Sequence, residues 1–205
     1  SGGERVALVS CDVICMPAAI ADPARELVEE RTGIPAGNVL ICATHTHTGP
    51  EMRKGRLIPT NDEWLDEVPD MIATVVERAC ADMFDAVLIP GRGFEDRLGS
   101  NRLGRKRNGS EVIDKGDTRR AAGPIDPELL ALSVRDEAGT VRAMIANYAM
   151  HADTVGGDGI SAGWPGRLAL AMRDVYGDQC VTVFFQGTCG DINHHHWRES
   201  RWPSK

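Results

Sequence analysis

Short apolar runs alternate with amphipathic helical patterns along this 205-residue chain, and this alternation constrains the fold more than any other feature. The first unit is an apolar run at Val6–Ser10, a helical segment at Asp22–Arg31 and a second apolar run at Asn38–Ala43. A strand, a helix and a strand at this spacing predict a βαβ unit with two parallel strands. We therefore expect an α/β fold.

Two helices are predicted in the N-terminal half, and the first carries start and stop signals. In the first, Asp22 suits the N-cap, Pro23 the first helical position and Gly33 the position past the end. A second helix is predicted over Asn61–Phe84, where apolar residues recur at three- and four-residue steps. Pro69 is expected either to kink the first part of that helix or to mark its true start.

The C-terminal half continues the same alternation. The apolar runs Leu129–Arg135 and Val141–Tyr148 flank a turn that contains glycine, which predicts a β-hairpin. Further elements are predicted at Ala86–Ile89 (strand), Trp164–Tyr176 (helix) and Cys180–Phe185 (strand). Together these elements predict one domain over residues 1–205, with a mixed β-sheet and flanking helices.

A polar stretch from about residue 99 to about residue 125 interrupts this pattern, because it is rich in Gly and Arg and has no periodicity. A loop of this length in a compact domain is usually functional or disordered. Its basic side chains most often only contact water, and the sharper interpretation is that one of them binds a substrate oxygen. The basic residues are Arg102, Arg105, Lys106, Arg107, Arg119 and Arg120.

Composition excludes some classes of function. The formal net charge of -7 argues against a protein that binds nucleic acid through its phosphates. No apolar run approaches the length of a membrane span, and no signal peptide is visible. The six cysteines match neither a zinc-ribbon spacing nor a disulfide framework, so we expect buried free thiols. The compartment and the oligomeric state stay open.

Two histidines follow the run Asn38–Ala43 within the segment Thr44–Pro50. Residues at i and i+2 of a strand point to the same face, so His45 and His47 are expected to emerge together at the strand end. Ligand sites of α/β folds lie at such ends, and neutral imidazole is a common zinc ligand. The alternative is that one or both rings only cap hydrogen bonds of the loop.

Two further strand ends carry polar groups: His151 with Asp153, and Asp191 with Asn193 and His194. Neighbouring strand ends would bring them into one cleft with the histidine pair. A catalytic zinc site needs about three protein ligands and an open position. Asp191 is also a candidate to orient a ligating histidine through its second nitrogen.

Consecutive histidines at 194–196 are not expected to hold one ion as a cluster, because neighbouring side chains point in different directions. His194 alone is the better candidate, since it continues the glycine-rich exit from the last predicted strand.

Four segments together resemble the neutral/alkaline (non-lysosomal) ceramidase family. They are His45–Pro50, Asn147–His151, Ser161–Gly166 and Phe185–Asn193, in the order of that family's catalytic domain, and the resemblance extends over about 6–194. It implies a zinc-dependent amidase that cleaves the N-acyl bond of ceramide or a related lipid amide.

The resemblance also implies roles for individual residues. His45 and His151 would be zinc ligands, and His47 would face the substrate and assist proton transfer. Arg102 is similar to the family's active-site arginine. With Asp191 added, the predicted catalytic set is His47, Arg102 and Asp191, and the predicted metal set is His45 and His151.

The chain departs from the family at several points. Asn193 stands where relatives have a serine proposed as nucleophile, and Gly163 stands where relatives often have an acidic residue. The family's remaining metal ligands, a glutamate and a tyrosine, fall beyond Lys205, and its opening segment falls before Ser1. We therefore expect a domain that is incomplete at both ends.

Three functional hypotheses follow. The leading one is a zinc-dependent hydrolase that cleaves an N-acyl amide bond of a lipid or small-molecule substrate by a metal-activated water. The alternatives are a catalytically silent domain with a binding or structural role, and a metal hydrolase that acts on a non-lipid substrate.

Overall fold

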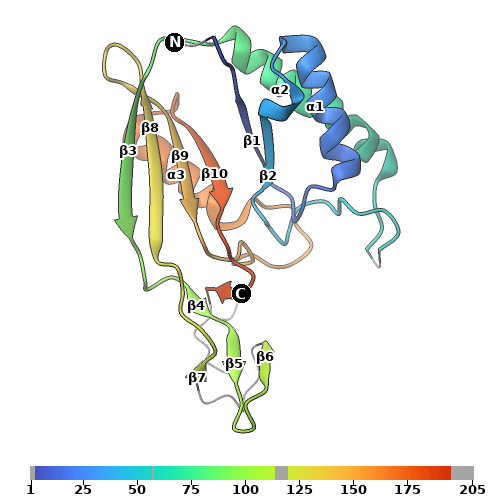
Figure 1. Ribbon diagram of the computed structural model, residues 1–205, viewed down its shortest axis with the longest axis vertical. Coiled ribbons are helices and arrows are strands. Elements are labelled where there is room, and N and C mark those ends of the chain that lie inside the picture. The colour runs from blue at the N-terminus through green and yellow to red at the C-terminus, as the bar shows by residue number, and fades with distance from the viewer. Residues whose placement is uncertain (1–2, 57, 114–119, 195–205) are drawn as a thin grey trace.

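The computed structural model describes residues 3–56, 58–113 and 120–194 (Figure 1). Arg119 and the histidines at 195 and 196, on which two of the expectations above fall, lie outside these residues, and for Arg120 only the backbone is described. The helices are α1 (Ala18–Thr32), α2 (Asp62–Ala81) and α3 (Gly163–Tyr176), with a 3-10 turn at Ala36–Asn38. The longer strands are β1 (Ala7–Cys11), β2 (Val39–Ala43), β3 (Val87–Phe94), β8 (Glu128–Arg135), β9 (Val141–Tyr148) and β10 (Val181–Gln186).

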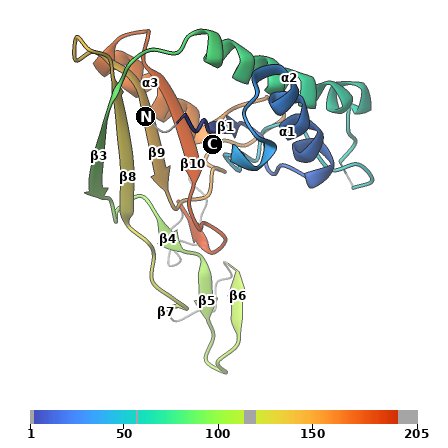
Figure 2. The same ribbon diagram turned by 45° about the horizontal axis from the view of Figure 1, so that its top comes forward.

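The largest sheet has the strand order β10-β9-β8-β3 and is mixed. β10 runs parallel to β9, whereas β8 is antiparallel to both β9 and β3. β1 and β2 form a separate parallel pair that lies beside β10, and the Ser10 hydroxyl donates to the Phe184 carbonyl at 2.6 Å. α3 lies against the large sheet, while α1 and α2 lie beside the β1–β2 pair (Figures 1 and 2). The predicted α/β fold with a mixed sheet and flanking helices is confirmed.

The predicted βαβ unit is present. β1 and β2 pair in parallel from Ala7 opposite Val39 to Cys11 opposite Ala43, and α1 connects them. Gly33 ends α1 in the left-handed conformation with φ 69°, which glycine adopts without steric cost, and its N–H donates to Glu29. The predicted end of this helix is therefore confirmed.

The predicted start of α1 is wrong. The helix begins at Ala18, with Pro17 rather than Asp22 as its N-cap, so Pro23 lies inside the helix. Residues 18–21 are apolar, and Ile20 is buried in the core between α1, α2 and the β1–β2 pair. Burial of this extra turn outweighs the capping preference of Asp22, which pairs with Arg25 instead.

α2 begins where the apolar periodicity predicts and ends at Ala81 rather than at Phe84. The Asn61 side chain accepts a hydrogen bond from the Trp64 N–H at 3.1 Å, and the helix runs from Asp62 to Ala81. Pro69 lies inside the helix and does not mark its start. The apolar face of α2, which includes Ile72 and Val76, packs against α1 and the β1–β2 pair.

The predicted long loop at about 99–125 is in part short strands. The strands are β4 (Ser100–Asn101), β5 (Leu103–Arg105), β6 (Glu111–Ile113) and β7 (Arg120–Ala121). β5 pairs with β6 and β7 in a small antiparallel sheet that extends beyond the main sheet (Figure 2), and β4 pairs with the distant β11 (Ile192–Asn193). Such short strands show no periodicity in the sequence, and their partners are not local.

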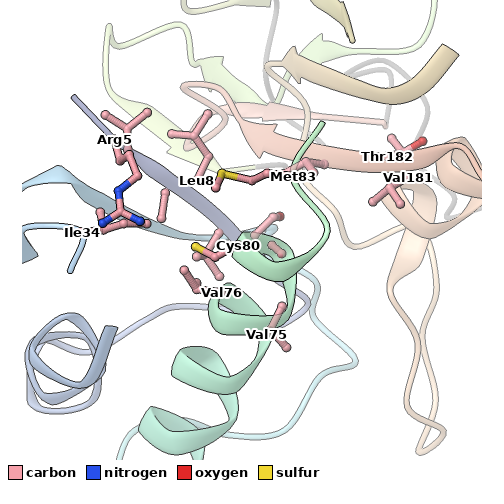
Figure 3. A pocket seen from close by; sticks show the side chains of 15 residues that line it. Arg5, Leu8, Ile34, Val75, Val76, Cys80, Met83, Val181 and Thr182 are labelled. Atoms are coloured by element: carbon pink, nitrogen blue, oxygen red, sulfur yellow. The ribbon is translucent and has the colours of Figure 1, made fainter. Parts of the chain in front are cut away.

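An apolar cavity of about 570 Å³ opens at the amino-terminal ends of β1 and β10 (Figure 3). Val6, Leu8 and Met83 line it together with Val181 and Thr182. The Oγ1 atom of Thr182 is buried and has no hydrogen-bond partner among the described residues. The histidines follow the opposite, carboxyl ends of their strands, so this cavity is not the candidate site.

Two sequence-level expectations concern the whole chain. All six cysteines are free thiols, as predicted, but only Cys180 and Cys189 are buried, and the other four are partly exposed. In the part of the chain that the structure describes, no helix is both long enough and apolar enough to cross a membrane.

An ion pair between Glu51 and the partly exposed Arg53 lies in the loop after the histidine pair. Glu51, whose side chain is only 4% exposed, accepts hydrogen bonds from Nε and Nη2 of Arg53 at 2.7 and 2.8 Å and from its backbone N–H at 3.0 Å. The Arg53 guanidinium, as the main cause, lowers the pKa of Glu51 from 4.5 to about 2. The ionised form is therefore the one that stabilises the fold.

We predict that Glu51→Gln destabilises the protein at neutral pH. Because the folded-state pKa lies below the unfolded value, the stabilisation is complete above about pH 4.5 and is lost as the pH falls toward 2. The difference in unfolding free energy between wild type and Glu51→Gln should therefore shrink between pH 5 and pH 3 in denaturant titrations. Glu26→Gln, at an exposed position of α1, is the matched control. A difference that is constant with pH would contradict the prediction.

Candidate metal centre

The histidine pair lies just beyond the end of β2, which stops at Ala43. His45 has φ 65° and is the only described residue other than glycine with a positive φ. The two imidazoles do lie together, with ring centroids 5.1 Å apart. The predicted cause, strand alternation, is wrong: the left-handed turn at His45 brings the rings together. Such a conformation costs about 1–3 kcal/mol and persists where the surrounding contacts enforce it.

Two backbone carbonyls fix the orientation of two histidines. Nδ1 of His45 donates to the carbonyl of Ile14 at 2.7 Å, and Nδ1 of His151 donates to the carbonyl of Cys189 at 2.7 Å. A carbonyl oxygen can only accept, so the proton of each neutral ring is assigned to Nδ1. The unprotonated Nε2 of each ring is then the atom that faces the centre of the site.

These two Nε2 atoms lie 3.1 Å apart, and the ring centroids of His45 and His151 lie 4.6 Å apart. Two lone pairs that face each other at this distance repel unless a proton or a metal cation lies between them. Nitrogens that bind one tetrahedral zinc ion at about 2.0–2.1 Å lie roughly 3.3 Å from each other. The separation of the two Nε2 atoms fits this geometry, and the carbonyl contacts to Nδ1 are those expected around metal-bound histidines.

His47 completes a group of three imidazoles. One ring nitrogen from each of His45, His47 and His151 lies within 4.8 Å of the others, which fits the donor set of a metal site. His151 is 3% exposed, whereas His47 is open to solvent. His47 is therefore placed either to bind the metal or to face an incoming substrate.

Desolvation favours the neutral, metal-binding form of His151 and His47. Desolvation is the main cause that lowers the pKa of His151, and the nearby Arg102 cation lowers it further. Desolvation also lowers the pKa of His47, against the opposing effect of the Asp153 carboxylate. Metal ligation requires neutral imidazole, so both shifts act in the direction that ligation needs.

Arg102, which the resemblance assigns to the active site, lies beside His151. Its Nη2 lies 3.3 Å from Nε2 of His151, and Nε and Nη2 both donate to the carbonyl of Gly190, at 3.2 and 2.9 Å. The backbone N–H of Arg102 donates to the Asp191 carbonyl at 2.7 Å. The arginine is thus anchored to the segment that follows β10.

Asp191 does not orient the second nitrogen of His45 or His151, because the carbonyls of Ile14 and Cys189 take that place. The Asp191 carboxylate accepts a hydrogen bond from Nδ2 of Asn101 at 2.8 Å and is exposed. Sequence reasoning missed Asn101, which is 3% exposed, and the two carbonyls. A backbone carbonyl gives no sequence signal, since every residue has one.

Asp153, Asn193 and His194 form a second polar group beside the three imidazoles. Asp153 accepts from Nδ2 of Asn193 at 2.9 Å, and its other oxygen lies 3.1 Å from Nδ1 of His194. Burial alone would raise the pKa of Asp153, but the Asn193 hydrogen bond and the charges of nearby histidines outweigh it and lower the pKa. The three strand ends do therefore meet, as predicted.

The other described basic residues of the predicted loop lie in the small sheet formed by β5, β6 and β7 or in its turn. Arg105 pairs with Glu111 across β5 and β6 at 2.6 Å. Lys106 and Arg107 lie at the turn between these two strands.

Comparison with known proteins supports the fold. No protein-family model and no curated protein matches the sequence. Two solved structures match with 21% sequence identity over 94% of this chain: a neutral ceramidase from Pseudomonas aeruginosa (TM-score 0.77) and a ceramidase complexed with C2 (TM-score 0.78). This chain covers 32% and 31% of those chains, so it spans about a third of their length. The fold that the motifs imply is confirmed.

The left-handed turn at His45 predicts a difference between two variants that both lack the imidazole. Alanine must hold φ near 65° at a steric cost, whereas glycine does so freely. His45→Gly should therefore be more stable than His45→Ala by about 1 kcal/mol in denaturant unfolding of the metal-free protein. Equal stability of the two variants would mean that the loop relaxes to a negative φ when the ring is removed.

Proposed function

We propose that this chain is a zinc-dependent hydrolase that cleaves an N-acyl amide bond. The observation that carries this proposal is the pair of unprotonated Nε2 atoms of His45 and His151, which face each other at 3.1 Å. The likeness to neutral ceramidase, in which this chain aligns along 94% of its length, supports the same class of reaction.

The residues divide into ligands and groups that act on substrate. His45 and His151 hold zinc through Nε2, with their Nδ1 atoms fixed by carbonyls. Zinc bound there would supply a Lewis acid that polarises the amide carbonyl and lowers the pKa of a water molecule. Histidine is a suitable proton carrier at neutral pH. We assign proton transfer to the leaving amine to His47, because its ring is the solvent-open member of the three.

Arg102 is the group that we assign to the substrate oxygen. Its guanidinium is anchored by two hydrogen bonds to the Gly190 carbonyl and still reaches Nε2 of His151. A fixed cation at this position stabilises negative charge that develops on a carbonyl oxygen during hydrolysis. A substrate with one amide carbonyl, either an N-acylated lipid such as a ceramide or a smaller N-acyl amine, meets this requirement.

One observation favours a second candidate, a zinc-binding domain without catalytic activity. The residue at the position of the family serine is Asn193, whose amide is buried and bonded to Asp153. An amide side chain cannot serve as a nucleophile in place of a serine. If the chain is a hydrolase, its nucleophile must therefore be water. If it is a silent domain, it binds zinc but does not turn over substrate.

We predict one tightly bound zinc ion per chain. His45→Ala and His151→Ala should each abolish stoichiometric binding, because each variant removes one of the two facing nitrogens. His47→Ala should retain zinc if its role is proton transfer. Metal content after dialysis, measured by atomic spectroscopy, checks this outcome. All proteins should carry His195→Asn and His196→Asn, so that the histidine run cannot bind zinc adventitiously. Zinc content that is unchanged in His45→Ala would overturn the assignment.

The zinc-loaded chain is expected to hydrolyse N-acyl amides, with activity lost on chelation and restored by zinc. Arg102→Gln should lower kcat by about a hundredfold, the magnitude for loss of one group that stabilises an oxyanion. The assay compares ceramides of different acyl length with short N-acyl amines and follows amine release. Turnover that survives chelation would contradict a metal mechanism. Full zinc occupancy without turnover on any of these amides would favour the silent domain.

A further inference from the structure

The segment Ser161–Trp164 makes hydrogen bonds to both loops that carry histidines. The first loop follows β2 and contains His45 and His47, and the second loop follows β9 and contains His151. On the side of the first loop, the hydroxyl groups of Thr46 and Thr48 both donate to the Ser161 carbonyl, at 2.7 and 3.0 Å. The Ser161 N–H donates back to the Thr48 carbonyl at 3.0 Å. Thr46 is fully buried, and it lies between His45 and His47 in the sequence. The conformation of the first loop is therefore tied to Ser161.

The same segment holds the second loop through Trp164. The indole Nε1–H of Trp164 donates to the carbonyl of His151 at 3.1 Å. The His151 N–H donates to the Ile192 carbonyl at 3.0 Å, and its Nδ1 donates to the Cys189 carbonyl. His151 is thus fixed through its backbone N–H, its backbone carbonyl and its ring.

Packing fixes Trp164 itself and leaves the segment little room. The Trp164 ring contacts Phe184 and Tyr148 edge-to-face, with centroids 4.6 and 6.1 Å apart. Gly163 has φ 63°, and a Cβ atom there would lie 3.2 Å from the Ala152 carbonyl oxygen. Glycine is therefore the residue that lets the segment approach the second loop this closely.

We propose that Ser161–Trp164 is a brace that sets the separation of His45 and His151, with Thr46 and Trp164 as positioning residues for metal binding. Two unprotonated Nε2 atoms at 3.1 Å repel each other in the absence of a cation, so they separate unless the backbone around them is held. A site that is held in the binding geometry before the metal arrives binds it more tightly, because less ordering is left for the binding step. This inference rests on the proposed function, since zinc binding by the two histidines is what the brace supports.

A merely structural role makes a different prediction. If the brace only anchored the start of α3, its loss would lower the stability of the metal-free protein and leave the intrinsic zinc affinity of the folded protein unchanged. A positioning role instead lowers the zinc affinity itself. Zinc dissociation constants and metal-free unfolding are therefore measured on the same set of variants.

Each variant removes one hydrogen-bonding group and keeps the approximate shape of the side chain. Trp164→Phe removes the indole N–H and keeps an aromatic ring, and Thr46→Val removes the hydroxyl and keeps the branched shape. Trp64→Phe is the matched control for Trp164→Phe, because Trp64 packs against the core between α1, α2 and the β1–β2 pair. Thr182→Val is the matched control for the second, because its hydroxyl has no partner among the described residues.

Zinc dissociation constants are measured by competition with a chromophoric chelator on the 205-residue chain, with His195→Asn and His196→Asn present in every variant and in the wild-type reference. We expect Trp164→Phe and Thr46→Val each to weaken zinc binding by about tenfold or more, the effect of losing a group that supports a metal ligand. Thr46→Ser, which keeps the hydroxyl, should return the dissociation constant to near the wild-type value. Both control variants should bind zinc as the wild type does.

The outcomes separate the two proposals. Wild-type chain that binds no zinc overturns the proposed function and the brace together. Tight zinc binding by the wild type that Trp164→Phe and Thr46→Val leave unchanged overturns the brace alone. Weakening that Thr46→Ser fails to reverse, or that the control variants match, reflects general loosening of the fold and also overturns the brace.

Discussion

Hydrogen bonds to the carbonyls of Ile14 and Cys189 determine which ring nitrogen of His45 and of His151 faces the other histidine, and the candidate site depends on this orientation. Each carbonyl follows the strand that runs parallel to the strand of its histidine. Ile14 follows β1 and serves the histidine after β2, while Cys189 follows β10 and serves the histidine after β9. Each parallel pair therefore supplies one imidazole together with the acceptor that orients it. The hydrogen bond from Ser10 to Phe184 joins β1 to β10, so the carboxyl ends of both pairs meet.

Local pattern was sufficient for much of the fold. The βαβ unit and the hairpin of β8 and β9 follow from apolar runs, a glycine at φ 69° after α1 and a glycine-containing turn, all of which act within a few residues. The start of α1 was not readable in this way, because burial of the turn that contains Ile20 depends on helix α2, which lies far along the chain. The short strand β4 escaped prediction for the same reason, since its partner β11 comes about ninety residues later.

The candidate site was predicted in part, and for a reason that the structure corrects. His45, His47 and His151 do converge with Arg102, but through a left-handed turn at His45 rather than through strand alternation. The residue type gives only a weak signal for such a turn, because a positive φ is uncommon in any residue other than glycine, although histidine adopts it more often than most. The carbonyl acceptors were equally invisible in the sequence.

In the proposed function, Arg102 and a metal ion would compete for one lone pair. Nε2 of His151 has a single lone pair once Nδ1 carries the proton, and Nη2 of Arg102 lies 3.3 Å from it. That lone pair can accept either the guanidinium proton or a metal, so metal ligation by His151 would release Nη2 from this contact. The hydrogen bond from Nε to the Gly190 carbonyl would still keep the guanidinium at the site. The released N–H would then be available to a substrate oxygen, while the Asp153 carboxylate offsets part of the positive charge that the imidazoles experience. In the proposed function, one arginine would therefore occupy the His151 lone pair in the metal-free site and bind the substrate oxygen in the metal-bound site.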